Sequence, residues 1–189
     1  MIRPSPRYAE LAAATNFSFL RGASHPEEMV ARAAELGLTG IGVADRNTLA
    51  GVVRAHVFAR ENRAALGGMR VAIGARLAFR DGSPDILAYP RDRAAYGRLC
   101  RLLTTGNLRA PKGECWLDLT DLIAFGEGLQ IIVLPSGKPD RLPALREAFG
   151  ERLWIGASLT YGEEMRGSLA RRTALARNSA RHSSPSTTR

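Results

Sequence analysis

The most chemically suggestive residue of this chain is Asp45, which ends the apolar run Ile41–Ala44 and precedes Arg46. A continuous run of this kind is typical of a strand that is covered on both faces. In open or barrel-like parallel α/β sheets, chemistry takes place at the carboxyl ends of strands. Asp45 could bind a divalent metal ion there, or it could pair with Arg46 or Arg76. We favour the ion pair, because a carboxylate among guanidinium groups stays ionised without a metal.

Other catalytic groups are not in the usual arrangements. The three histidines, His25, His56 and His182, do not lie at metal-ligand spacing to one another, so structural or solvated roles are predicted for them. Ser18 and Ser24 lack a nearby His-Asp arrangement, which makes a hydrolytic triad improbable. The glycine-rich pieces are turns, since no GxGxxG or GKS/GKT pattern occurs.

The cysteines and the larger aromatic residues fit structural roles. Cys100 and Cys115 are predicted to be reduced, partly buried thiols, because no second cysteine pair completes a metal site. Four aromatic residues could stack on nucleic-acid bases, but each falls in the apolar stripe of a predicted element, which favours core packing. These are Tyr89, Tyr96, Trp116 and Trp154.

The elements that would position Asp45 alternate between strands and helices. Ser24, with Glu27 three residues later, forms a capping-box pattern that starts a helix, and Gly37 ends it. The turn signal Asp81-Gly82 predicts that residues 80–89 pair back as a hairpin at the sheet edge. The predicted strands are 8–14, 41–44, 71–79, 80–89, 129–134 and 153–159. The predicted helices run from Ser24 to Gly37, over 49–62, from Asp92 to Gly106-Asn107, and over 119–125, 141–149 and 163–177.

This alternation predicts an α/β fold, either a parallel layer or an incomplete barrel. A length of 189 residues with 45% hydrophobic content favours one domain. No apolar run approaches the roughly 20 residues that span a bilayer, and the N-terminal residues lack a secretory signal, so a cytoplasmic protein is expected.

The net charge of +9 is concentrated near the C-terminus. Residues 166–189 contain six arginines and no acidic residue, so residues 1–165 carry only +3. The modest excess fits an ordinary globular domain, and the basic tail is a weak indication of nucleic acid or another polyanion.

Segments from about Tyr8 to Arg177 resemble a known family. They are YAEL, NFSFLRGASHPEEMVARAAELG, GVADRNTLAGVVRAH, IGARLAF, DILAYPRDRAAYGRLCRLLTTGN, KGEC and LQIIVLP. Together they resemble the N-terminal PHP (polymerase and histidinol phosphatase) domain of bacterial error-prone DNA polymerases, relatives of the replicative alpha subunit. The resemblance implies an incomplete, distorted (βα) barrel that is smaller than a TIM barrel.

The resemblance also implies where metal ligands would lie, because active members hold divalent metals with His, Asp and Glu at the strand ends. The His-x-His pair of the first strand falls on alanines, and the acidic position after it on an asparagine. Asp45 survives, but the histidine after it and the glutamate of the third strand are arginines. The positions are Ala12, Ala14, Asn16, Asp45, Arg46 and Arg76. We therefore expect a remnant of a metal site, with no metal, cofactor or catalytic residue in this chain.

The resemblance stops abruptly near Arg177, so we expect a truncated PHP domain over residues 8–177. Residues 1–7 are expected to be flexible, and residues 178–189 to form a disordered basic tail rich in Ser and Thr. One possible set of codons for residues 182–188, when read from the third base of the first codon, encodes Leu-Leu-Ala-Val-Asn-Asp. This sequence matches the apolar strand and the Asp-bearing turn that the family would supply. We hypothesise a frameshift near Ser179, which the nucleotide sequence would test.

Several functions follow as expectations. The first is a non-catalytic PHP domain of an error-prone DNA polymerase, whose parent copies damaged templates during DNA repair and replication. Its partners would be the rest of the polymerase and accessory proteins, with DNA contacted only weakly or indirectly. The alternatives are a metal-dependent phosphoesterase that uses Asp45, a nucleic-acid-binding module that uses residues 166–189, and an unstable product with an unpaired sheet edge.

Overall fold

The computed structural model describes residues 8–134 and 141–156, in which six strands form one sheet in sequence order. The strands are β1 (Ala9–Ala13), β2 (Gly40–Arg46), β3 (Arg70–Leu77), β4 (Ile86–Pro90), β5 (Leu129–Val133) and β6 (Leu153–Ile155). The helices are α1 (Pro26–Glu35), α2 (Val52–Glu61), α3 (Arg93–Arg109), α4 (Leu119–Phe125) and α5 (Leu142–Phe149), followed by the 3₁₀ turn η2 (Gly150–Arg152). The predicted alternation of strands and helices is confirmed.

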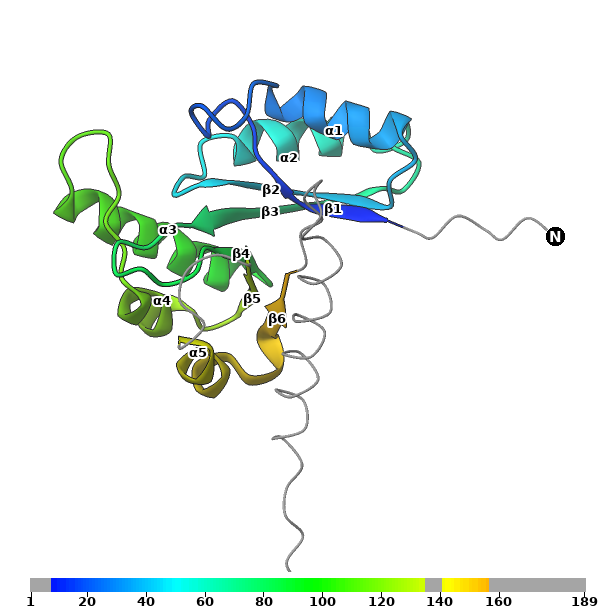
Figure 1. Cartoon of the computed structure of the whole chain (residues 1–189). Coiled ribbons are helices and arrows are strands. Elements are labelled where there is room, and N and C mark those ends of the chain that lie inside the picture. Colours follow the sequence, from blue (N-terminus) through cyan, green and yellow to red (C-terminus); the bar gives the residue numbers. More distant parts are fainter. Residues whose placement is uncertain (1–7, 135–140, 157–189) are drawn as a thin grey trace, which may run out of the picture.

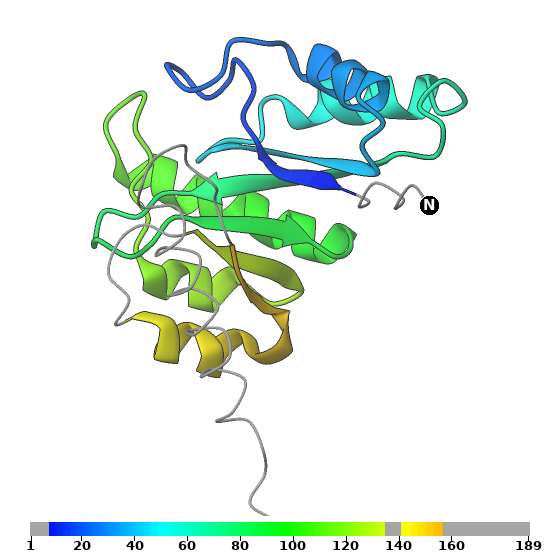
Figure 2. The same cartoon turned by 45° about the vertical axis from the view of Figure 1, so that its right-hand side comes forward.

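The sheet curls, and its helices lie on the convex side (Figures 1 and 2). α1 and α2 lie over β1, β2 and β3, while α3, α4 and α5 follow the other half of the sheet. The expected incomplete, distorted barrel is thereby confirmed as a half-barrel of six strands. No helix within residues 8–134 and 141–156 is long and apolar enough to cross a membrane.

Two apolar cores lie between the helices and the convex face of the sheet. The first joins α1 and α2 to the sheet through buried residues that include Val30, Ile41, Val43 and Ala55. The second lies under α3, α4 and α5 and includes Leu77, Ile86, Leu99, Leu122 and Ile131. β3 contributes to both, because Val71 packs against the first core and Leu77 lies in the second.

β4 is an interior strand of the described sheet and runs against its neighbours. β1, β2 and β3 are parallel to one another, β4 is antiparallel to both β3 and β5, and β5 is parallel to β6. The predicted pairing of residues 80–89 with the preceding strand is confirmed, but the predicted edge position is wrong. Ile86 and Ala88 lie in the convex core while Leu87 and Tyr89 lie in a cluster on the opposite face, so the strand is buried on both sides.

The concave face carries small residues that let Tyr89 cross it. The Tyr89 hydroxyl donates a hydrogen bond of 2.5 Å to the Leu11 carbonyl oxygen in β1. A Cβ at Gly42 would lie 2.4 Å from that hydroxyl oxygen, and one at Gly74 would lie 2.6 Å from the tyrosine ring. Glycine at these two positions thus lets one side chain of β4 reach across β3 and β2 to the first strand, and the predicted core packing of Tyr89 is confirmed.

Two helix ends differ from the sequence prediction. The capping box of α1 begins one residue later than expected, since the backbone N–H of His25 donates to the Glu28 carboxylate. Glu27 instead forms an ion pair with Arg54 of α2. α3 continues past Gly106, because that glycine allows close packing: a Cβ there would lie 2.6 Å from the Leu117 side chain.

The remaining predicted elements match closely or fall outside the described residues. α2 begins at Val52 rather than at position 49, while α4 has the predicted limits. Of the predicted strand 153–159, residues 153–155 form β6. The predicted helix over 163–177, the N-terminal segment 1–7 and the tail 178–189 lie outside the described residues.

Candidate functional site

Asp45 is buried, with 2% of its surface exposed, and both its oxygens accept hydrogen bonds from the β1–α1 loop. Oδ1 accepts from the Thr15 backbone N–H at 2.7 Å and from the Ser18 hydroxyl at 2.6 Å. Oδ2 accepts from the Thr15 hydroxyl at 2.7 Å. No ion pair joins Asp45 to an arginine among the described residues, so the predicted pairing with Arg46 or Arg76 is wrong.

The loop that surrounds Asp45 is held by its own turns. Ser18 N–H donates to the Thr15 carbonyl, and the carbonyl of Ser18 accepts from the N–H groups of Arg21 and Gly22. A Cβ on Gly51 would lie 3.0 Å from Asp45 Oδ2, so the residues before α2 also close over the carboxylate. Asp45 therefore fastens the β1–α1 loop to the end of β2.

Asp45 faces the opposite side of the sheet from Arg46 and Arg76, two of the positions that the family resemblance implied. Val43 belongs to the convex core, and side chains alternate along a strand, so Asp45 also lies on the convex side. Ala13 belongs to that core too, whereas its neighbour Ala12 is exposed. By the same alternation Arg46 lies on the concave side.

Arg76 lies on the concave side as well, between Ala75 and Leu77 of the second core, and sits opposite Arg46 in the β2–β3 register. It is already paired, because its Nη2 lies 2.6 Å from Asp85 Oδ2 and its Nε donates to the same oxygen. Asn16 supplies a buried side-chain oxygen that has no hydrogen-bond partner among the described residues. The concave side of these strand ends therefore carries two guanidinium groups, of which that of Arg76 is paired with Asp85.

These residues do not fit a divalent metal cluster. Ala12 and Ala14 have no donor atoms, two positions carry guanidinium groups, and Asp45 has its oxygens occupied by three hydrogen bonds. A metal cluster needs several carboxylates or neutral imidazoles that converge on one point. No group of three or more His, Cys, Asp or Glu side chains suited to a metal occurs within the described ranges.

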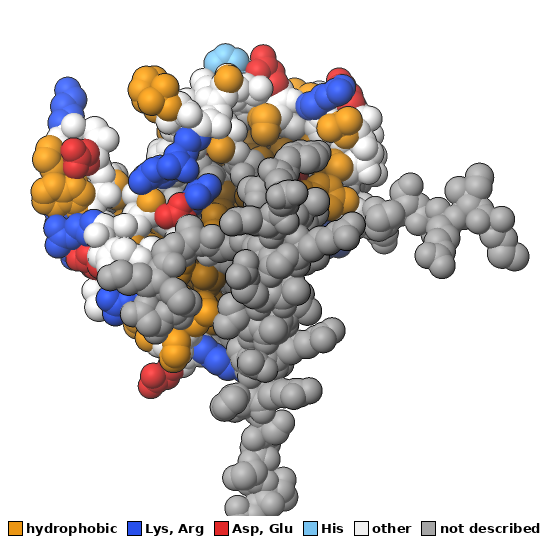
Figure 3. Space-filling model, in the orientation of Figure 1, with side chains coloured by type: hydrophobic (Ala, Val, Ile, Leu, Met, Phe, Trp, Pro, Cys, Tyr) orange, Lys and Arg blue, Asp and Glu red, His pale blue; other side chains and the backbone are white. Residues whose placement is uncertain are grey.

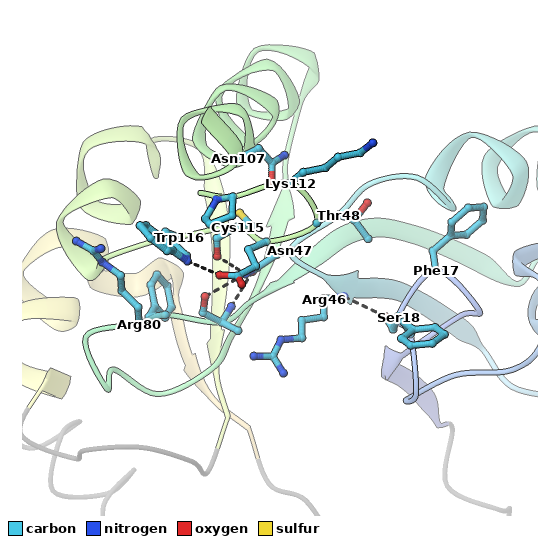
Figure 4. A pocket seen from close by; sticks show the side chains of 16 residues that line it. Phe17, Ser18, Arg46, Asn47, Thr48, Arg80, Asn107, Lys112, Cys115 and Trp116 are labelled. Atoms are coloured by element: carbon cyan, nitrogen blue, oxygen red, sulfur yellow. Dashed lines mark hydrogen bonds between the residues drawn. The ribbon is translucent and has the colours of Figure 1, made fainter. Parts of the chain in front are cut away.

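A cavity of about 850 Å³ opens beside Arg46, at the carboxyl ends of β1, β2 and β3. Its walls are the β1–α1 loop at Phe17–Phe19, the residues after β2 and β3, and the α3–α4 connection at Pro111–Trp116. Figure 4 shows Arg46 between the side of the cavity that carries Phe17 and Ser18 and the side that carries Arg80 and Trp116. Sequence reasoning did not find this cavity, because its walls come from four separate segments.

Asn47 joins three of these segments. Its side chain accepts a hydrogen bond from the Ala78 N–H at 2.8 Å and donates to the carbonyl oxygens of Ala78 and Cys115 at 3.1 and 3.4 Å. Its backbone has a φ of 50°, a left-handed value that asparagine tolerates better than most residues. Asn47 thus holds the ends of β2 and β3 against the α3–α4 connection.

The far wall is organised around Trp116. Its indole N–H donates to Glu114 at 2.7 Å, and the Arg80 guanidinium carbon lies 5.5 Å from the ring centroid. Arg80 also forms an ion pair with Asp118 at 3.1 Å. Burial raises the pKa of the neighbouring Cys115 thiol, which keeps it protonated.

The other predicted candidates lie apart from this cavity or play structural parts. His25 and His56 are exposed, as expected for solvated residues, and His182 lies outside the described residues. Cys100 and Cys115 are free and partly buried, as predicted. Core packing is wrong for Trp154, which is 59% exposed in β6.

Comparison with known protein families matches residues 10–151 to the PHP domain. The chain belongs to the PHP domain family. This PHP domain is 50% identical over 175 residues to the error-prone DNA polymerase of Rhodopseudomonas palustris (strain BisB5), a match that covers 88% of the chain and 15% of that protein. It is 52% identical over 160 residues to the error-prone DNA polymerase of Brucella abortus, covering 82% of the chain and 15% of that protein.

The PHP domain thus spans about 15% of the length of these curated relatives. Among solved structures it resembles a protein from Bifidobacterium adolescentis classed as a metal-dependent phosphoesterase, with a TM-score of 0.63 and 16% identity. That match covers 92% of this chain and 85% of the other. At this identity the likeness concerns the fold alone.

Proposed function

We propose that this chain is the PHP region of an error-prone DNA polymerase and that it supports the polymerase rather than hydrolysing phosphoesters. The observation that carries this proposal is the identity of about one half to error-prone DNA polymerases over more than four fifths of the chain. The parent protein would synthesise DNA across template lesions during DNA repair, in the cytoplasm. The domain would act through contacts with the remainder of the polymerase and its accessory proteins.

The strand-end residues support a non-catalytic role. A metal-dependent phosphoesterase needs a metal-bound hydroxide as nucleophile and a second electrophilic contact for the leaving oxygen. Alanines at positions 12 and 14 supply no ligand, and Arg46 adds positive charge on the side where cations would have to gather. Asp45 has a structural role instead, because its hydrogen bonds with Thr15 and Ser18 hold the β1–α1 loop in place.

The test is metal content and metal-dependent stability of the purified chain, alongside hydrolysis of p-nitrophenyl phosphate. We expect no stoichiometric metal by elemental analysis and no change in melting temperature with Mn²⁺ or Zn²⁺. A metal that binds only the folded state would add about 2.7 kcal/mol at a hundredfold excess over its Kd, which a melt detects easily. Stoichiometric metal, together with hydrolysis that is lost in Asp45→Ala, would establish the phosphoesterase function instead.

The link to a polymerase has its own test. The longer product of the genomic region that encodes this chain should extend a primer opposite a template lesion, while the 189-residue chain alone should not. A genomic region without polymerase sequence would contradict the proposed parent. In that case the chain would keep its PHP fold, but its link to DNA synthesis would be lost.

A further inference from the structure

We propose that the cavity beside Arg46 binds a nucleotide unit, with its phosphate against Arg46 and its base against the aromatic side chains of the rim. The unit could be a free nucleotide or one residue of single-stranded DNA. This inference rests on the cavity itself and holds whether or not the chain belongs to a polymerase.

The first argument is the charge left uncompensated in the cavity. Its charged side chains are those of Arg46, Arg80, Lys112 and Glu114. Arg80 is neutralised by Asp118 at 3.1 Å. Arg46 and Lys112 are exposed and form no ion pair among the described residues. Figure 3 shows basic side chains on the face where the molecule is hollowed between its upper part and the lobe that carries α3. Arg46 together with Lys112 on the rim outweighs the one carboxylate of Glu114, so the lining keeps a positive balance that favours an anionic ligand.

The second argument is the aromatic surface that the fold holds open at this hollow. Phe17 and Phe19 flank Ser18, whose hydroxyl is fixed on Asp45 at 2.6 Å, so both rings are carried by an anchored loop. Phe19 is 84% exposed and therefore packs against little of the protein. Trp116, which is half-buried, lines the opposite wall. Exposed rings beside cations are the arrangement by which proteins hold single-stranded nucleic acid, because every base has a face that can stack.

The third argument is size and hydrogen-bonding capacity. A volume of about 850 Å³ lies within the range of small-ligand sites. The side chains of Thr48 and Asn107 line the cavity and can bond to sugar or base edges. A nucleotide uses all three kinds of group, cationic, aromatic and polar, whereas inorganic phosphate would use only the first.

The proposed site uses side chains between Phe17 and Trp116 only, whereas the arginine-rich residues 166–189 would attract any polyanion without regard to this cavity. It also makes no use of a metal ion. Arg46 stands at a position where the family resemblance implied a metal ligand, so its guanidinium would supply positive charge at that position.

The experiment measures binding of a fluorescein-labelled oligothymidylate to the full chain by anisotropy over a range of salt concentrations. Arg46→Gln should weaken binding roughly tenfold and lower the salt slope by about 0.7, the value for one phosphate contact on a single strand. Phe19→Ala should weaken binding by about tenfold with the salt slope unchanged. Arg63→Gln is the matched control, because Arg63 is exposed, lies after α2 and has no ion pair among the described residues.

Unlabelled thymidine monophosphate distinguishes the two sources of the ligand. If it displaces the oligonucleotide and loses affinity in Arg46→Gln, the site takes a free nucleotide. If only the oligonucleotide binds and responds to the variants, the site takes a strand.

The proposal is overturned if neither probe binds, or if Arg63→Gln weakens binding as much as Arg46→Gln. The latter result would assign binding to diffuse charge, including residues 166–189. Thermal melts of every variant verify folding. The Arg46 side chain makes no hydrogen bond within the described residues, so its replacement should leave the melting temperature unchanged.

Discussion

A carboxylate at the end of a buried strand can serve a metal or a neighbouring loop, and the donors around Asp45 decide between these roles. One backbone N–H and two hydroxyl groups converge on its two oxygens at 2.6–2.7 Å. Short hydrogen bonds to a carboxylate are stronger than those between neutral groups. Because they join residues about 30 positions apart, the carboxylate links β2 to the loop after β1.

We predict that Asp45→Ala destabilises the fold by about 3 kcal/mol, because it leaves up to three buried donors without an acceptor. Urea denaturation followed by circular dichroism measures this loss, and it should be the same with and without Mn²⁺. Glu147→Ala is the control, since Glu147 is exposed on α5 and should change stability by less than about 0.5 kcal/mol. A loss of stability that appears only when metal is present would instead assign Asp45 to a metal site.

The placement of Asp45 could be read from the sequence, but its partners could not. The apolar run before it fixes the strand and therefore its end. Whether Thr15, Ser18 or an arginine reaches the carboxylate depends on how the β1–α1 loop turns, and that loop includes Leu20 with a φ of 61°, a value that its residue type does not predict. The pairing with Arg46 or Arg76 was expected because guanidinium groups keep a carboxylate ionised, whereas alternation along the strand directs Arg46 to the other face.

At the scale of elements, apolar periodicity predicted the strands and helices. The predictions were wrong where a residue type, such as glycine, can serve either a turn or close packing. Gly106 resembles a helix end, but here it admits Leu117 and Cys115 against α3. Residues 80–89 resemble an edge hairpin because of the Asp81-Gly82 turn. The unbroken apolar run Ile86–Tyr89 was the better signal, since a strand buried on both faces has no polar alternation.

The α3–α4 connection is held by a bidentate ion pair between its two helices. Arg109 Nη1 and Nη2 donate to the two oxygens of Asp121 at 2.7 and 2.9 Å, and the Asp118 N–H donates to the same carboxylate. Partial burial pushes the pKa of Asp121 upward, but the hydrogen bonds from Arg109 and Asp118 outweigh it and hold the pKa below its usual value. The clamp fixes one wall of the cavity.

We predict a stability contribution from this clamp that disappears in acid. A carboxyl group with a lowered pKa stabilises the folded state above the unfolded pKa of about 3.9, and the contribution is lost as pH falls through the folded value. Asp121→Asn should therefore lower stability by about 1–2 kcal/mol at neutral pH. The difference from the natural sequence should shrink once pH drops below about 3.9.

Thermal melts of both proteins from neutral pH down to the acid limit of the fold measure this convergence. Arg109→Gln removes the other partner and should converge with the natural sequence over the same pH window. A gap between Asp121→Asn and the natural sequence that stays constant throughout would show that packing, rather than charge, explains the effect.

At the scale of the whole molecule, the curled sheet joins two helix-covered cores into one body. The α1–α2 core and the α3–α5 core share no helix, and β3 is the strand that packs against both, through Val71 and Leu77. The backbone hydrogen bonds of β2 with β3 extend over the full length of β2, from Gly40 to Arg46. Because β2 and β3 are paired along this whole length, we expect the unfolding of one core to destabilise the other.

We therefore predict one cooperative unfolding transition for both cores. Ile41→Ala empties part of the first core and Leu99→Ala part of the second, and each should cost about 2–5 kcal/mol, because both side chains are nearly or fully buried. Trp116 and Trp154 both lie in the α3–α5 half of the chain, so tryptophan fluorescence reports on that half alone. If the cores unfold together, Ile41→Ala shifts the fluorescence midpoint in urea as far as it shifts the midpoint by circular dichroism. A fluorescence midpoint that stays in place while the dichroism midpoint falls would mean that β3 does not couple the two cores, and that the α1–α2 half, with the loop that carries Phe19, opens by itself.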